Sequence, residues 1–271
     1  MPIDDGQIRM KPKVYLIGAG PGDPELLTVK AHRILRQADV VLHDELVSRG
    51  ILDLVRPSAR VQNIGKRCGR QSIRQEEIHS RMVSCAREGL TVVRLQGGDP
   101  LVFGRANEEI AALRACGVEF EIIPGVTAAL AAAASARISL TDRRLASRVT
   151  FLTNHWCAGK AAPDMTHEAS SGATVVVYMP GGDNALLSRR LQAAGFNGDT
   201  PCVIVSRAST SEEVVLCTTV AELPKAPHLP APCVLLAGAV VAAAICPRRE
   251  DEAEAEALLG IAPANEDALA C

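Results

Sequence analysis

The sequence predicts an α/β fold, and three observations support this class. Short apolar runs alternate with segments of helical periodicity, and loops that contain glycine or proline separate the two. This alternation is typical of a mostly parallel sheet that helices cover on both faces. An alanine-rich helix over 127–136 then divides the chain, and the second part repeats the same alternation.

The first half is expected to contain five strands and three helices. Its first strand ends in a glycine loop, and Gly89 and Gly117 are typical stops for the second and third helices. The strands are expected at 14–17, 40–42, 61–64, 92–95 and 120–123, and the helices at 26–37, 75–88 and 107–115. Parallel α/β sheets bind ligands at the carboxyl ends of their strands, so the loops that follow these strands are candidate sites.

The second half is expected to contain fewer elements and to end in an acidic segment. Strands are expected at 149–153, 174–178, 202–206 and 233–237, a helix at 184–194 before Gly195, and loops at 157–164 and 224–232. Residues 250–267 carry seven acidic side chains and no lysine or arginine, which indicates a frayed helix or a disordered tail. We therefore divide the chain into a flexible N-terminus (1–12), an N-terminal α/β domain (13–125), a C-terminal α/β domain (126–246) and an acidic tail (247–271).

The composition argues against several classes of protein. The 271 residues carry a net charge of −2 and only 3% aromatic side chains, so we expect no nucleic-acid partner. The longest run of apolar and glycine residues, Cys233 to Cys246, is too short for a membrane span, and no apolar stretch precedes Val14, so we expect no membrane anchor and no secretion signal. The nine cysteines are scattered and form no C-x-x-C pair, which favours a reducing, cytoplasmic location without a zinc site or disulfides.

Two glycine loops follow strands of the first half. In the first, residues 18–24, Asp23 stands where a nicotinamide-dinucleotide fingerprint has its third glycine, which counts against an NAD-binding site. The second, Gly97-Gly98-Asp99-Pro100, offers exposed backbone and a carboxylate that can accept hydrogen bonds from a hydroxyl or amine. Either loop could instead be a tight turn without a ligand, with Asp99 as its cap.

Several consecutive segments carry a resemblance to a known family. They read VYLIGAGPGDPELLTVKAHRILRQADVVLHDELVS, IGKRCGRQS, QEEI, VVRLQGGDPLVFGRANEE, IIPGVTAALAAAASARISLTDRRLASRVTFLTNH and VVVYMP. In this order they resemble the tetrapyrrole methylases, and within them the uroporphyrinogen-III C-methyltransferases. The resemblance implies two α/β domains with S-adenosyl-L-methionine in the cleft between them, normally in a homodimer. It also implies methylation of two ring carbons of uroporphyrinogen III to give precorrin-2, the branch point toward sirohaem, cobalamin and haem d1.

The same resemblance implies which residues bind the cofactor and its product, S-adenosyl-L-homocysteine. They lie in both glycine loops, at the start of the alanine-rich helix and in the second half: Pro21, Gly97, Gly98, Asp99, Val102, Thr127, Ala128, Met179 and Ala208. Small residues and exposed backbone suit the adenine and methionine portions, and a carboxylate suits polar groups. Methionine is also a common core-filling residue, so Met179 depends most on its place after the strand.

The acid–base candidates are Asp44, after the second strand, and Lys66, which the resemblance implies as proton acceptor and donor. After methylation the macrocycle is cationic and must lose a proton, so a nearby carboxylate is useful. Glu108, whose family counterpart lies beside the substrate, and its neighbour Arg105 are further candidates. The sequence leaves open whether Asp44 or Glu108 is the base, and either could simply be a cap or a solvated acid.

The substrate carries eight carboxylates, so its site is expected to be basic. Residues 60–94 hold eight lysines or arginines against three acids, and residues 137–148 add a further excess of arginine. Arg67 and Arg105 are the leading candidates to bind the carboxylates, followed by Arg143, Arg144 and Arg148. About half of these side chains could be solvated surface instead.

The chain departs from the family pattern at four places. It has Ala106-Asn107 where the family has Gly-Gly, Gln96 for lysine, Asn154-His155 for Gly-His, and Pro180 for the glycine after the methionine. These changes affect the expected shape of the substrate loop and the rim of the cofactor pocket. The alternatives are a methylase of a later corrin intermediate, a non-catalytic sensor or carrier of tetrapyrrole or S-adenosylmethionine, and an NAD-dependent oxidoreductase.

Overall fold

The computed structural model describes residues 11–65, 74–155 and 172–245. Within it the chain forms two compact units. Unit 1 comprises Met1–Ser135, Ser206–Val214 and Pro230–Cys233, and unit 2 comprises Ala136–Val205, Val215–Leu229 and Val234–Cys271. The predicted loop 157–164, the acidic tail and most of the flexible N-terminus lie outside the described residues. The predicted boundary between residues 125 and 126 stays a prediction.

Unit 1 is built on a five-stranded sheet with the order β3-β2-β4-β1-β5. Its strands are β1 (Val14–Gly18), β2 (Val40–His43), β3 (Arg60–Asn63), β4 (Val92–Gln96) and β5 (Phe120–Ile123). Each pair of neighbouring strands is parallel. The prediction of a parallel sheet is therefore confirmed for the first half.

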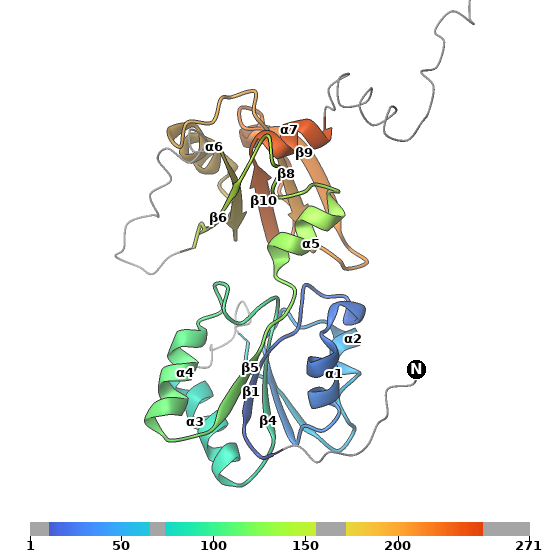
Figure 1. Ribbon diagram of the computed structural model, residues 1–271, viewed down its shortest axis with the longest axis vertical. Helices are drawn as coiled ribbons and strands as arrows, with labels where there is room; N and C mark the ends of the chain where they lie inside the picture. The colour runs from blue at the N-terminus through green and yellow to red at the C-terminus, as the bar shows by residue number, and fades with distance from the viewer. Residues whose placement is uncertain (1–10, 66–73, 156–171, 246–271) are drawn as a thin grey trace, which may run out of the picture. The chain divides into compact units, whose positions relative to one another are not determined.

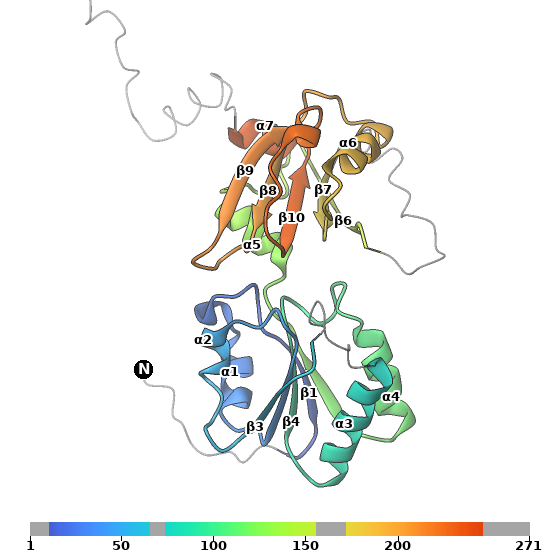
Figure 2. The same ribbon diagram turned by 180° about the vertical axis from the view of Figure 1, so that it is seen from behind.

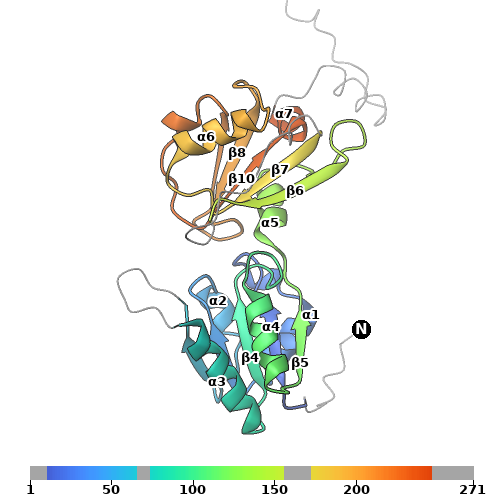
Figure 3. The ribbon, with the colours of Figure 1, turned by 90° about the vertical axis from the view of Figure 1, so that its left-hand side faces the viewer.

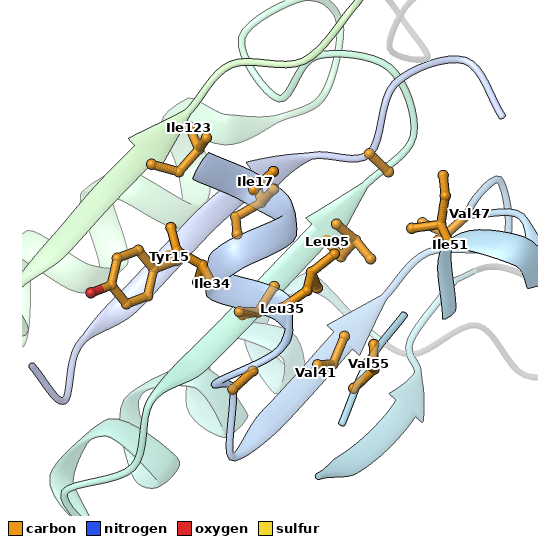
Figure 4. Packing of buried hydrophobic residues seen from close by; sticks show 14 residues of the cluster. Tyr15, Ile17, Ile34, Leu35, Val41, Val47, Ile51, Val55, Leu95 and Ile123 are labelled. Atoms are coloured by element: carbon orange, nitrogen blue, oxygen red, sulfur yellow. The ribbon is translucent and has the colours of Figure 1, made fainter. Parts of the chain in front are cut away.

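Helices cover both faces of this sheet (Figures 1 and 2). On one face lie α1 (Val29–Leu35) and α2 (Arg49–Leu52), and on the other lie α3 (Gln75–Arg87) and α4 (Ala106–Ala115). Successive strand residues point to opposite faces, so β1 supplies both cores. Tyr15 and Ile17 pack with the α1 side (Figure 4), whereas Val14 and Leu16 pack with the α3 and α4 side.

The helix boundaries have local causes. The first predicted helix, 26–37, is in fact a 3-10 turn, η1 (Pro24–Leu26), followed by α1. The helix begins only after Thr28, because the Thr28 hydroxyl accepts a hydrogen bond from the Ala31 amide (3.1 Å) and caps the first turn. Gly89 and Gly117, both with positive φ, follow α3 and α4 as predicted.

The second sheet has the order β6-β7-β10-β8-β9; Figure 2 labels all five strands, and Figure 3 shows the sheet from another side. Its strands are β6 (Arg148–Thr153), β7 (Ala173–Tyr178), β8 (Pro201–Ser206), β9 (Val214–Thr219) and β10 (Cys233–Ala237). The remaining elements are α5 (Ala128–Ser135), α6 (Asn184–Ala193), the 3-10 turn η2 (Leu223–Lys225) and α7 (Ala239–Ile245). Strand β7 pairs parallel with β6 but antiparallel with β10, so this sheet is mixed. Strand β9 was not predicted, although it begins with the short apolar run 214–217, and it is a largely exposed edge strand. Among the described residues, no helix is both long and apolar enough to cross a membrane.

Candidate active site

The loops at the carboxyl ends of the strands in unit 1 contact one another. Gly20 and Gly98 form an isolated antiparallel bridge, in which the Gly98 amide donates to the Gly20 carbonyl (2.7 Å) and the Gly20 amide donates to the Gly98 carbonyl (3.1 Å). The two glycine loops, 78 residues apart at these positions, therefore lie side by side at one edge of the sheet, as predicted.

Two further glycines make this approach possible: Gly18, which begins the first glycine loop, and Gly125, which the sequence analysis did not select. A Cβ atom on Gly18 would lie 2.6 Å from the Gly125 amide nitrogen, and one on Gly125 would lie 2.4 Å from the Gly98 carbonyl oxygen. Any side chain would therefore displace backbone. A signal for Gly125 was present, because it follows Pro124 directly after the predicted strand 120–123.

Asp99 connects the second glycine loop to the loop after β5. Its Oδ1 accepts a hydrogen bond from the Leu101 amide (2.8 Å), and its Oδ2 accepts one from the Gly125 amide (2.9 Å). The first bond is the turn cap that the sequence allowed as an alternative. The second bond joins two loops, so Asp99 shapes the edge at which a ligand would bind. Each carboxylate oxygen has a further lone pair for such a ligand.

Asp44 is held in a similar way at the end of β2. Its Oδ1 accepts from the Leu46 amide (3.0 Å) and its Oδ2 accepts from the Gly97 amide (3.0 Å). A Cβ on Gly97 would lie 2.7 Å from the Leu46 Cβ, so only glycine allows this approach. The proposed base is thus fixed in orientation directly beside the first residue of the second glycine loop.

Glu108 is in a different environment, at the start of α4. Arg105 binds it with both ends of its guanidinium group, from Nε to Oε1 (2.8 Å) and from Nη2 to Oε2 (2.6 Å). The hydrogen bond from Arg105 holds the pKa of Glu108 below its usual value. Both side chains are about half exposed, at 49% and 48%. Arg105 and Glu108 therefore neutralise each other at the surface.

Fewer basic side chains are available to bind the substrate's carboxylates than the count in the sequence indicated. Arg94 is buried in an ion pair with Glu109, at 2.9 Å between Nε and Oε1, so it cannot reach a substrate. Arg60 and Arg81 pair with Glu88 and Glu77 on the surface. The remaining predicted arginines, Arg143, Arg144 and Arg148, are exposed, and Arg144 lies 3.8 Å from Asp142. Lys66 and Arg67 lie outside the described residues.

Several loop residues other than glycine adopt the left-handed backbone conformation. In unit 1 they are Phe103 and Arg105, in the loop after β4, and Arg207 and Ser209, which flank Ala208 after β8. In unit 2, Met179 after β7 has a φ of 49° and is 44% exposed. Such strained positions cluster at functional sites, because the surrounding structure must hold them in place. Three of the predicted cofactor residues, Val102, Met179 and Ala208, stand at or directly beside these positions.

The remaining predicted cofactor residues of unit 1 also lie near the glycine loops. The Asp23 amide donates to the Ser209 hydroxyl (3.4 Å), which brings the loop of Pro21 next to the segment of buried Ala208. A Cβ on Gly98 would have the Ala128 amide nitrogen, 3.9 Å away, as its nearest neighbour, so the backbone there is open on that side.

Two residues complete the predicted set in unit 1. Thr127 is buried, and its carbonyl begins the hydrogen-bond ladder of α5 by accepting from the Leu130 amide (3.0 Å). Val102 is half-buried, and its amide donates to the Asp99 carbonyl (3.2 Å). Both therefore belong to the framework of the loops that carry the other predicted residues.

The sequence of this chain is similar to one family of known proteins and to members of it. The sequence model of the family described as Tetrapyrrole (Corrin/Porphyrin) Methylases matches residues 13–224. The S-adenosyl-L-methionine-dependent uroporphyrinogen III methyltransferase of Arabidopsis thaliana, a chloroplastic protein, is 48% identical over 199 residues, which are 73% of this chain and 54% of that protein. Siroheme synthase 1 of Yersinia enterocolitica is 44% identical over 238 residues, which are 88% of this chain and 50% of that protein. The chain therefore spans about half the length of these curated relatives.

A solved structure matches over nearly its whole length. Uroporphyrin-III C-methyltransferase from Thermus thermophilus, in complex with S-adenosylhomocysteine, superimposes with a TM-score of 0.73. The two chains are 38% identical, and the match covers 85% of this chain and 99% of that one.

Proposed function

The chain belongs to the tetrapyrrole (corrin/porphyrin) methylase family, and from this we propose that it transfers methyl groups from S-adenosylmethionine to two ring carbons of uroporphyrinogen III, giving precorrin-2. The observation that carries the proposal is the match to the Thermus thermophilus enzyme, which covers almost all of that protein. The hydrogen bond between Asp44 and Gly97 supports it, because it places a carboxylate at the glycine loop expected to bind the methyl donor.

The residues present fit an S-adenosyl group. Gly97, Gly98 and Asp99 are half-buried and offer backbone without side chains and a carboxylate. Ala128 lies beside Gly98, and the loop of Pro21 lies next to the segment of Ala208. When bound, the cofactor supplies the methyl group and leaves as S-adenosylhomocysteine. The protein's contribution is then chiefly to orient the reacting carbon, since the leaving thioether is neutral and needs little assistance.

We assign the proton acceptor to Asp44. Once the ring carbon has gained a methyl group the macrocycle is positively charged, and a base must take a proton from it to restore neutrality. Asp44 is oriented by two backbone amides and stands next to Gly97. Glu108 is occupied by Arg105, which also lowers its pKa and so makes it a weaker base.

The basic side chains available for the substrate's carboxylates are the exposed Arg143, Arg144 and Arg148, together with Arg105. Arg105 is kept among these candidates as a guanidinium group that stays paired with Glu108 at the start of α4. Lys66 as proton donor and Arg67 as substrate ligand complete the proposal. We also propose a homodimer, following the family, and a cytoplasmic location, following the scattered cysteines.

The test is an anaerobic reaction of the purified chain with S-adenosylmethionine and uroporphyrinogen III, followed by mass spectrometry of the product. We expect a tetrapyrrole that has gained two methyl groups, with S-adenosylhomocysteine formed in proportion. A protein that binds both ligands but forms no S-adenosylhomocysteine would instead be a sensor or carrier. Methylation only of a later corrin intermediate would identify a different member of the family.

The Glu108→Gln variant separates the two candidate bases. We expect kcat to fall by less than about tenfold, because glutamine keeps the size of the side chain and can still accept a bond from Arg105, while a true general base contributes about 10²-fold or more. Initial rates at saturating concentrations of both substrates are the measurement. A loss of about 10³-fold would transfer the role of the base from Asp44 to Glu108.

A further inference from the structure

The turn that carries Met179 has a strained backbone and is held by hydrogen bonds from Asn154. Met179 has a φ of 49° and Gly181 a φ of 81°, with Pro180 between them. A left-handed methionine costs free energy, so neighbouring groups must hold the turn in this conformation. In unit 2 these groups come from the end of β6 and from α6.

Asn154, directly after β6, binds the carbonyl groups on both sides of Met179. Its backbone amide donates to the Tyr178 carbonyl (3.0 Å), and its side-chain Nδ2 donates to the Pro180 carbonyl (2.7 Å). A Cβ on Gly181 would lie 3.5 Å from Nδ2, so the asparagine fits closely under the turn. One residue therefore binds the carbonyl of the residue before Met179 and that of the residue after it.

Arg190 of α6 fixes the orientation of that asparagine. Its guanidinium Nη1 donates to the Asn154 Oδ1, which sets the amide group with its nitrogen toward Pro180. Burial lowers the pKa of Arg190, so the guanidinium is partly removed from water. A charge-assisted hydrogen bond in such surroundings is stronger than one in solvent.

We propose that Asn154, oriented by Arg190, is a positioning residue that holds Met179 in its strained conformation and thereby sets the affinity for the S-adenosyl cofactor. The inference rests on the proposed function, in which Met179 contacts that cofactor. Asn154 and Pro180 are two of the positions at which this chain departs from the family pattern of glycine. A glycine at 154 could not donate from a side chain, so this support for the turn depends on the departure.

The experiment compares S-adenosylhomocysteine binding by the full-length protein and its Asn154→Asp variant, measured by isothermal titration calorimetry. Aspartate keeps the size of the side chain and the acceptor for Arg190, but it has no N–H for Pro180. We expect the Kd to rise about tenfold, the effect of losing one well-placed hydrogen bond. We also expect the KM for S-adenosylmethionine to rise in parallel and kcat to change far less. Asn197→Asp, the same exchange at an exposed turn after α6, is the matched control and should leave the Kd unchanged.

The outcomes separate this inference from the proposed function. If the wild-type protein does not bind S-adenosylhomocysteine, the proposed function fails. If the wild type binds and Asn154→Asp binds equally well, only the positioning role is overturned. Arg190→Met supplies a second arm, because its effect on the Kd should not add to that of Asn154→Asp if both act through one contact. Full additivity would contradict the inference, and thermal unfolding of each variant checks that the fold is kept.

Discussion

We expect Asp44→Asn to lower kcat by about 10²–10⁴-fold, the usual contribution of a positioned general base. Asparagine is isosteric and Oδ1 can still accept from one backbone amide, but the variant cannot take up the proton that the methylated macrocycle must lose. Because one of the amides of Leu46 and Gly97 also loses its acceptor, a modest weakening of cofactor binding should accompany the loss of rate.

The measurement combines single-turnover rates with S-adenosylhomocysteine affinity, so that chemistry and binding are read separately. Asp53→Asn is the matched control, because Asp53 is an exposed aspartate whose partner is Arg49 on the surface of α2. We expect that control to match the wild type in both measurements. A kcat for Asp44→Asn within a few-fold of wild type would show that the proton leaves by another route.

The central strands of unit 1 could be predicted because β1 and β2 are short apolar runs that begin and end clearly in the sequence. Strand β3 is different, since Arg60–Asn63 is exposed and contains only one apolar residue. The position and direction of strands in the second sheet could not be predicted, because they depend on which strands pair with one another. Strand β9 is rich in valine and threonine, which favour strands, so this signal was missed, and its place at the edge of the second sheet could not be read from the sequence. The antiparallel direction of β10 beside β7 is likewise a property of the chain path and not of either strand.

For the candidate site, the sequence predicted the functional side chains but not the groups that bind them. Asp44 and Asp99 follow strand ends, where the fold class places ligands, and the resemblance to the family implied their roles. Their partners could not be read from the sequence. The Gly97 amide reaches Asp44 across 53 residues, and the Gly125 amide reaches Asp99 across 26. Arg94 was counted in the basic segment expected to bind the substrate's carboxylates, but it is buried against Glu109, which lies on a helix that follows in the chain.

The second large effect that we predict is a loss of stability when the buried ion pair of Arg94 and Glu109 is broken. We expect Glu109→Ala to lower the free energy of unfolding by about 3–5 kcal/mol, because it leaves the Arg94 guanidinium in the core without its counter-charge. The two side chains are 7% and 0% exposed. Arg94 also donates to the Leu95 carbonyl (3.1 Å), and Gln75 donates to the same Glu109 oxygen (3.3 Å). Urea unfolding followed by circular dichroism measures the change.

Two comparisons show whether the charge itself is responsible. Glu108→Ala, one residue earlier, removes a half-exposed ion pair and should cost less than about 1 kcal/mol, because consecutive helical residues face different sides of the helix. The double variant Arg94→Met with Glu109→Leu should recover most of the stability, since an apolar pair of similar volume commonly replaces a buried ion pair without loss. If the double variant is as unstable as Glu109→Ala, then packing at these positions, and not an unpaired charge, causes the loss. In either case, the first turn of α4 carries two glutamates with different partners. Glu108 pairs with Arg105 at the candidate site, and Glu109 pairs with Arg94 of β4 in the core.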